Sequence, residues 1–209
     1  YPDLIEMYER ELSITEDKDQ AVFLLDKIGW THEEKLGDLE NAIKAYRRIL
    51  SIVPNHLPAI RTLAKMYAAA KRWNDLLDIS ELEIDLTKDQ KQIVSLLHKV
   101  GEIFEENLGD RAKAVERYQK VLALSPSYLP VLKSLGRIYL SEGRHRDLVD
   151  MYRREIEVTK NQEQVVSLLF KIGDLYAGNL DEADAAIETF DKLLAITPAA
   201  HAATTFSVS

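Results

Sequence analysis

The chain repeats itself with a period of 72 residues. Residues 75–126 aligned with residues 147–198 share 23 identities in 52 positions, and most of the remaining differences are conservative. Prolines and glycines fall into the same columns of this alignment, the prolines at 54, 126 and 198 and the glycines at 29, 101 and 173. A fixed period of this length is typical of repeat proteins, in which each unit buries its apolar side against the next.

Each 72-residue unit contains four segments in which apolar residues recur about every 3.6 positions. In the middle of the chain these segments are 75–87, 90–107, 110–124 and 127–143. None of them alternates with the two-residue period of a strand, so the sequence predicts an all-α fold. Because the connections are short, we expect neighbouring helices to be antiparallel.

The residues between these segments suit helix ends. Asp17, Asp89 and Asn161 stand at N-cap positions with a glutamine three residues later, which is the spacing of a capping box. Gly37 and Gly109 can adopt the left-handed conformation that ends a helix, and the aspartates that follow them can cap the next one. The prolines at 54, 126 and 198 end the third segment of each unit, after which Asn55 and Ser127 can cap the fourth.

Half of the unit is about 36 residues, close to the 34 residues of a tetratricopeptide repeat. Residues 97–126 carry a leucine and then small, aromatic and proline residues at the positions where that family has them: Leu97, Gly101, Phe104, Ala114, Tyr118 and Pro126. The chain therefore resembles a tetratricopeptide repeat (TPR) array that alternates two slightly different repeats, as large bacterial TPR proteins do. The first repeat of each unit has one extra residue in its turn.

The resemblance covers residues 3–198 and implies a right-handed α-α superhelix, a TPR-like solenoid of about 11 helices. It predicts one solenoid over residues 1–198, in which an orphan helix at 3–16 precedes five helix pairs. The pattern fades after Pro198, so we expect residues 199–209 to be a degenerate helix or a disordered tail. The chain begins on the second helix of a pair, which suggests an excerpt from a longer array.

In TPR proteins the first helix of each pair lines a concave groove, so the resemblance also implies a binding face. The candidate groove residues are Asp26, Trp30, Arg61, Lys65, His98, Glu102, Lys133, Arg137, Phe170 and Asp174. Further acidic candidates follow one turn later, at Glu33, Glu34, Glu105 and Glu106. The sign of the charge alternates from one first helix to the next.

Two interpretations of this alternation stay open. Neighbouring first helices can pair across the groove, for example Arg61 with Asp26 or Lys133 with Glu102, as exposed ion pairs worth about 0–1 kcal/mol each. Alternatively, the groove binds an extended or helical peptide of mixed charge, with the two aromatic residues as anchors. Lys133 and Arg137 resemble part of the TPR clamp for C-terminal carboxylates, but Glu102 would repel such a ligand.

Composition argues against several other functions. The 27 basic and 35 acidic residues give a net charge of −8, which disfavours binding to nucleic acid, including RNA-reading helical repeats, and to anionic membranes. There are no cysteines, which leaves the compartment open, with the cytoplasm favoured. No apolar run approaches the roughly 20 residues of a membrane span. The five histidines form no i, i+4 pair, and no phosphate-binding loop is present, so we expect no enzyme, metal or cofactor.

These observations predict a protein-interaction scaffold that binds a partner protein or peptide in its groove. The alternative is a structural spacer or self-assembly segment of a longer repeat protein. In either case we expect uncapped helix ends to favour end-to-end self-association.

Overall fold

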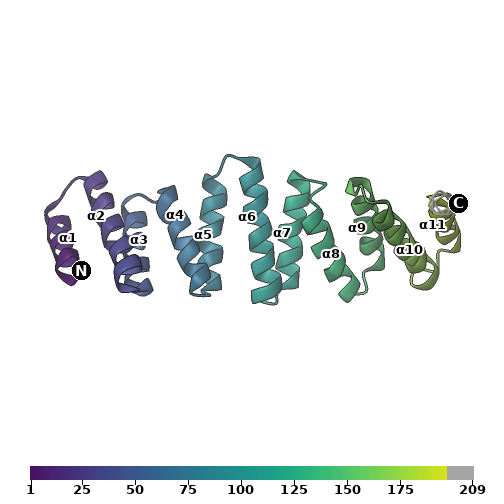
Figure 1. The fold of residues 1–209 in the computed structure, drawn as a ribbon, viewed down its shortest axis with the longest axis horizontal. Helices are drawn as coiled ribbons and strands as arrows, with labels where there is room; N and C mark the ends of the chain where they lie inside the picture. The colour runs from purple at the N-terminus through teal and green to yellow at the C-terminus, as the bar shows by residue number, and fades with distance from the viewer. Residues whose placement is uncertain (197–209) are drawn as a thin grey trace, which may run out of the picture. The chain divides into compact units, whose positions relative to one another are not determined.

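The computed structural model describes residues 1–196, and all regular structure in this range is helical. The chain divides into two compact units, Tyr1–Gly109 and a second that begins at Asp110. In each unit every helix packs against the next one along the chain (Figure 1). The expected all-α, TPR-like solenoid fold is confirmed, with eleven α-helices in the described range.

The first unit contains six α-helices and two π-helical turns: α1 (Pro2–Ile14), α2 (Lys18–Trp30), η1 (Thr31–Lys35), α3 (Leu39–Ile52), α4 (Leu57–Ala69), α5 (Trp73–Leu86), α6 (Gln90–Glu102) and η2 (Ile103–Asn107). The orphan helix expected at 3–16 is α1, which packs against α2. The π-helical turns continue α2 and α6 directly, at the end of the first helix in the two repeats of this kind that begin in the first unit. A wider turn of this kind accommodates one additional residue without breaking the helix.

The second unit contains the remaining helices: α7 (Arg111–Leu124), α8 (Leu129–Ser141), α9 (His145–Val158), α10 (Gln162–Gly178) and α11 (Ala183–Ile196). The expected third pair consists of α6 and α7, which fall in different units. A single solenoid over residues 1–198 therefore stays a prediction. The expected tail at 199–209 lies outside the described residues.

The caps of the second helices and of the long first helices form as expected. The Asp17 carboxylate accepts hydrogen bonds from the backbone N–H groups of Asp19 and Gln20, and Asp89 and Asn161 cap α6 and α10 in the same way. The caps predicted for α4 and α8 were wrong, since these helices start one residue later. His56, rather than Asn55, caps α4 through its Nδ1 atom, and Tyr128 precedes α8 without a side-chain cap.

Two turns hold residues other than glycine in the left-handed conformation. Lys71 has φ 56°, and the equivalent position in the second unit is Gly143, with φ 67°. Asp181 has φ 55° at the position of Gly37 and Gly109. At each of these positions one copy of the repeat has a strained residue where another copy has an unstrained glycine.

Replacing Lys71 with glycine should stabilise the first unit by about 1 kcal/mol, because it removes the steric cost of a left-handed lysine. Urea unfolding followed by circular dichroism measures the change. The reverse substitution, Gly143→Lys, should destabilise the second unit by a similar amount. If both substitutions were neutral, these turns would not be under backbone strain.

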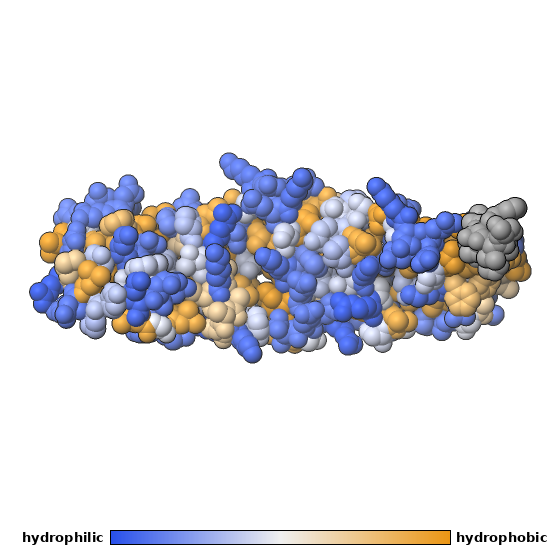
Figure 2. Space-filling view, viewed as in Figure 1, coloured by the Kyte–Doolittle hydropathy of each residue, from blue (hydrophilic) through white to orange (hydrophobic). Residues whose placement is uncertain are grey.

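The surface shown in Figure 2 is mostly polar, with apolar side chains in separate small patches. Polar residues cover the visible faces of the helices, while the apolar side chains that fill the interior come from the sides on which neighbouring helices pack. Ile60, Leu63 and Met66 on α4 are examples, each at most 1% exposed.

Candidate functional site

The ten predicted groove residues all lie on first helices of the repeats: on α2, α4 and α6 in the first unit, and on α8 and α10 in the second. Eight of them are exposed, while His98 and Glu102 are half-buried. Glycines at 29, 101 and 173, on the same helices, are buried. The groove residues of each unit therefore lie on the exposed side of helices whose small residues face the core.

Arg61 on α4 holds a buried carboxylate. Its Nε donates a hydrogen bond to Glu83 Oε1 at 2.8 Å, and its Nη2 donates to Gln92 Oε1 at 3.4 Å. Glu83 lies on α5 and is only 8% exposed. The expected pairing of Arg61 with Asp26 is therefore replaced, because the second helix of its own pair supplies a closer carboxylate. Arg61 links α4, α5 and α6, so it contributes to the packing of the fold.

The acidic and basic first helices of the first unit do interact electrostatically. Burial raises the pKa of Glu33 on η1, its neighbour Glu34 raises it further, and the Lys65 ammonium on α4 opposes both. Burial, with the charges of Asp26 and Glu33, also raises the pKa of the Tyr46 hydroxyl. The acidic end of the first helix of one repeat and the lysine on α4 therefore interact in the first unit, although the partners differ from those expected.

Trp30 gives the first unit an exposed aromatic surface. Its side chain is 45% exposed and lies beneath the Lys35 ammonium, which is 4.8 Å from the ring centroid. A cation held over an indole ring is a favourable but weak contact at an exposed site, worth about 0.5–1 kcal/mol. Much of the ring remains open to a ligand.

In the second unit a cavity of about 190 Å³ lies between α8, α9 and α10. It is lined by Leu129, Lys133, Glu155, Thr159, Gln164, Ser167, Leu168 and Lys171. The predicted groove residue Lys133 is therefore part of a real depression. Phe170 is on α10 next to Lys171 in the sequence and is 57% exposed. The centroid of its ring lies 6.2 Å from that of Phe190.

The remaining predicted residues make local contacts. Arg137 Nη2 donates to Ser134 Oγ at 3.2 Å on the same helix. His98 Nε2 lies 3.6 Å from Glu102 Oε1, one turn away on α6. Asp174 is exposed on α10. Pairing of Lys133 with Glu102 would join residues of different units and stays a prediction.

A repeated glutamate on the second helices α1, α5 and α9 was not predicted from the sequence. Glu11, Glu83 and Glu155 are 72 residues apart, and the last two are 8% and 7% exposed. Glu11 accepts a hydrogen bond from Gln20 Nε2 at 2.9 Å. Among the described residues the Glu155 carboxylate has no hydrogen-bond or ion-pair partner, although Lys133 and Lys171 line the same cavity. The sequence signal that could have found this glutamate is its recurrence every 72 residues in the alignment of the repeats.

Burial raises the pKa of Glu155, and the nearby charges of Lys133 and Lys171 only partly oppose this. A raised pKa in the folded state means that the ionised carboxylate costs stability at neutral pH. That cost disappears once the carboxyl is protonated in the folded and unfolded states, below the unfolded pKa of about 4.3.

Glu155→Gln should therefore stabilise the second unit by about 1 kcal/mol at neutral pH, and the gain should vanish as the pH falls toward 4. Urea unfolding at a series of pH values measures it. Glu157→Gln, at an exposed position of the same helix, serves as the control and should change little. A gain that grew on acidification would contradict the assignment of burial as the cause.

Residues 1–196 contain no group of three or more His, Cys, Asp or Glu side chains that could hold a metal ion. Over the same range, no helix combines the length and the apolar character required to cross a membrane. What the first-helix face presents is a set of exposed charges and aromatic rings suited to contact with another chain.

Comparison with known families gives matches over most of the chain. Models described as tetratricopeptide repeat match residues 23–56, 96–128, 131–166 and 166–199. A pentatricopeptide repeat-containing protein of Arabidopsis thaliana is 29% identical over 117 residues, which is 53% of this chain and 18% of that protein. The chain spans between 11% and 54% of the length of the curated relatives it matches.

Solved structures share the fold. MamA superposes with a TM-score of 0.51 at 22% identity, covering 90% of this chain and 96% of MamA. YrrB, described as a TPR protein with an unusual peptide-binding site, gives a TM-score of 0.50 at 16% identity over 96% of this chain and 99% of YrrB. Repeat matches, helix order and buried glycines agree, and the chain belongs to the tetratricopeptide repeat family.

Proposed function

We propose that this chain is a protein-interaction scaffold whose first-helix face binds an extended or helical segment of a partner protein. The tetratricopeptide repeat fold generally serves as such a scaffold. The observation that carries the proposal is the cavity between α8 and α10, because it places Lys133 and Lys171 beside the buried Glu155 carboxylate. A depression with both charge signs suits a ligand that carries both.

The exposed rings add affinity to this arrangement. Trp30 in the first unit and Phe170 in the second are each about half exposed on first helices. Aromatic residues dominate the binding energy of interfaces when a partner covers them. We propose that each anchors an apolar side chain of the partner, while Lys65, Lys133 and Arg137 select its acidic residues. The scaffold then needs no chemistry of its own.

The test compares a groove variant with a matched surface variant in pull-downs from a lysate of the source organism. The groove variant carries Lys65→Glu, Lys133→Glu and Arg137→Glu. Arg61 is left unchanged because it holds Glu83, and its loss would confuse unfolding with loss of binding. The matched variant carries the same change of net charge at exposed positions at or just before helix starts, as Lys18→Glu, Lys88→Glu and Lys160→Glu.

A partner held by the unaltered chain and by the matched variant, but lost by the groove variant, is the expected result. Circular dichroism checks that all three proteins are folded. Partners retained equally by all three would count against the groove and favour the spacer.

The spacer alternative rests on the apolar residues exposed on α1 and α11. Ile14 on α1 is 81% exposed, and Ile187 and Leu194 on α11 are 60% and 61% exposed. Apolar residues gather in Figure 2 near the end of the second unit at which α11 lies. If these surfaces join copies of the chain, light scattering should show a mass that rises with concentration. Ile187→Glu with Leu194→Glu should abolish the rise, and a constant monomer mass would contradict self-association.

A further inference from the structure

The same cleft occurs once in each unit, outside the first-helix face. In the first unit it lies between α3, α4 and α5 with a volume of about 400 Å³, and in the second between α7, α8 and α9 with about 330 Å³. Each is lined by nine residues, and each residue of one cleft has its counterpart 72 positions away in the other. We call these the first and second outer clefts.

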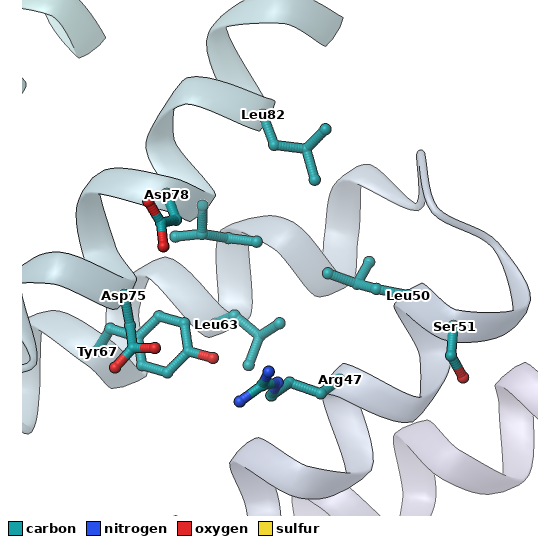
Figure 3. Close-up of a pocket in the computed structure, with 9 residues that line it drawn as sticks. Arg47, Leu50, Ser51, Leu63, Tyr67, Asp75, Asp78 and Leu82 are labelled. Atoms are coloured by element: carbon teal, nitrogen blue, oxygen red, sulfur yellow. The ribbon is translucent and has the colours of Figure 1, made fainter.

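Both clefts have an apolar floor. In the first outer cleft, Leu63, Tyr67 and Ile79 are each less than 9% exposed, while Leu50 and Leu82 form the walls (Figure 3). In the second, the floor residues are Leu122, Leu135, Tyr139 and Met151. Such a floor can cover the methylene stem of a long side chain.

A tyrosine hydroxyl in each cleft has no partner. Tyr67 and Tyr139 are 4% and 3% exposed, yet neither hydroxyl makes a hydrogen bond with any described residue. Their rings are fixed by Arg72 and Arg144, which stack at 5.0 and 4.2 Å from the ring centroids. Neither hydroxyl oxygen is fully buried, so each can accept a hydrogen bond from solvent or from a ligand that enters the cleft.

One aspartate at each rim is also unpaired. Asp75 and Asp147 already bind Arg72 and Arg144, at 2.8 Å in both cases. One turn further along the same helix, Asp78 and Asp150 have no ion-pair or hydrogen-bond partner within the described part of the chain. Each cleft therefore has one rim carboxylate without an ion-pair contact, in a chain whose net charge is already −8.

Each cleft also contains one arginine, but the two arginines are not at equivalent positions, because one comes from α3 and the other from α9. Arg47 on α3 points toward the Tyr67 hydroxyl in the first cleft, where the second cleft has Gln119 (Figure 3). Arg154 on α9 lines the second cleft but donates to the backbone oxygen of Pro126 at 3.1 Å. Arg146 and Arg153 lie near Asp150 in a neighbouring pocket, without an ion pair to it. The guanidinium of Arg47 is thus an intramolecular cation already beside the tyrosine of the first cleft.

We propose that each outer cleft binds a lysine or arginine side chain from a basic segment of a partner protein. The cation meets Asp78 or Asp150 at the rim, its N–H groups donate to the tyrosine hydroxyl, and its methylene stem lies on the leucines of the floor. The chain then has two sites of the same specificity, one per unit. They are independent of the first-helix face, so this inference does not rest on the proposed function.

The test is a chemical-shift titration of the ¹⁵N-labelled chain with a short soluble peptide that has a Lys-Leu-Lys core. The same peptide with Glu-Leu-Glu is the comparison. We expect the lysine peptide to shift the amide signals of residues around Tyr67 and Asp78, and separately those around Tyr139 and Asp150. The glutamate peptide should shift neither set.

Each cleft is the control for the other. Asp78→Asn should weaken binding at the first cleft about tenfold and leave the second unchanged, and Asp150→Asn should do the reverse. Tyr67→Phe keeps the ring and should weaken the first cleft several-fold. Arg47→Gln should strengthen the first cleft, because it removes the competing cation; a merely structural role for these residues would not give that gain.

Three results would overturn the proposal. One is a set of shifts spread over all acidic residues and weakened equally by Glu16→Gln and Glu157→Gln, exposed positions outside both clefts. Another is unchanged binding after Asp78→Asn and Asp150→Asn. The third is a set of shifts confined to the first-helix face and lost in the Lys65, Lys133 and Arg137 groove variant, which would place the peptide in the groove instead.

Discussion

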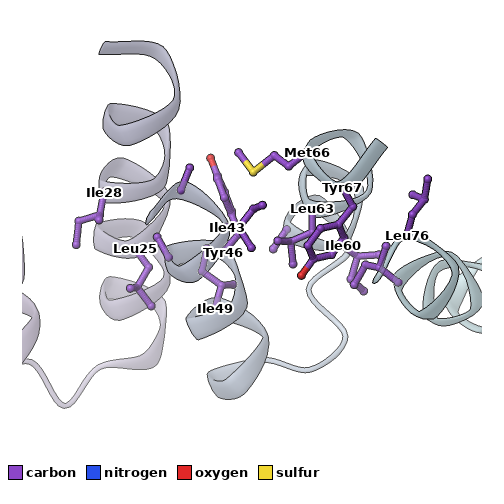
Figure 4. Packing of buried hydrophobic residues seen from close by; sticks show 14 of the residues in the cluster. Leu25, Ile28, Ile43, Tyr46, Ile49, Ile60, Leu63, Met66, Tyr67 and Leu76 are labelled. Atoms are coloured by element: carbon purple, nitrogen blue, oxygen red, sulfur yellow. The ribbon is translucent and has the colours of Figure 1, made fainter. Parts of the chain in front are cut away.

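Gly29→Ala and Gly173→Ala should each destabilise the chain by about 2 kcal/mol, because the new methyl group would collide with an aromatic ring. A Cβ at position 29 would lie 2.6 Å from Tyr46 Cε2, and one at position 173 would lie 2.6 Å from Phe190 Cε1. Figure 4 shows Tyr46 packed among Ile43, Ile49 and Leu25, so its ring has little room to move. Overpacking of about 3 kcal/mol exceeds the gain of about 1 kcal/mol from replacing a helical glycine.

Gly136→Ala is the matched control for this prediction. Glycine 136 lies in α8, but a Cβ there would be 3.6 Å from its nearest neighbour, Leu148 Cδ1, which is ordinary contact. The substitution should therefore stabilise the chain by up to about 1 kcal/mol. Urea unfolding should show a lower free energy of unfolding for Gly29→Ala and Gly173→Ala and a higher one for Gly136→Ala, although all three glycines lie on first helices. Equal effects at all three positions would show that helix propensity, rather than the close approach of the rings, governs these sites.

A double substitution separates the collision from other causes. Phe190→Leu replaces the ring that Gly173 contacts with a smaller aliphatic side chain. Gly173→Ala should therefore cost much less in a chain that already carries Phe190→Leu. A strictly additive result would mean that the clash is relieved elsewhere in the second unit.

The local features of this fold could be predicted from the sequence because they repeat and depend on near neighbours. Helix periodicity and the capping residues Asp17, Asp89 and Asn161 act within one turn of the chain, and the structure confirms them. The glycines at 29 and 173 stand out in the sequence as one alignment column, and in the structure each lies against an aromatic ring. The predicted capping residues of α4 and α8 were wrong because each helix starts one residue later than expected, which moves the N-cap position by one residue.

The electrostatics of the groove could be predicted only in part. The sequence places Arg61 on the exposed side of a first helix, but which of several acidic neighbours it reaches depends on the packing of α5. Glu83 and Glu155 resemble solvated glutamates on amphipathic helices, and only the adjacent helices bury them. The outer clefts were missed for the same reason, since three helices contribute to each.

The buried carboxylate under Arg61 leads to the second large effect: Arg61→Met should destabilise the first unit by about 2 kcal/mol at neutral pH. The substitution keeps an apolar stem but leaves Glu83, which is 8% exposed, without the guanidinium bonded to it at 2.8 Å. A buried charged group that loses its partner bears its full desolvation cost, commonly about 1–3 kcal/mol even when one partner is partly exposed. Lys133→Met, at the equivalent position, should cost well under 1 kcal/mol, because Lys133 forms no ion pair with Glu155 among the described residues.

The double variant Arg61→Met with Glu83→Gln decides whether the lost charge pair is the cause. Removing both charges takes away the uncompensated carboxylate, so the double variant should be more stable than Arg61→Met alone. Urea unfolding of the two single variants, the double variant and the unaltered chain completes the cycle. If the double variant were as unstable as the sum of the single ones, contacts of Arg61 other than its charge pair with Glu83, such as the one to Gln92, would account for the effect. Arg61 would then still stabilise the fold, and the groove variant would still have to leave it unchanged.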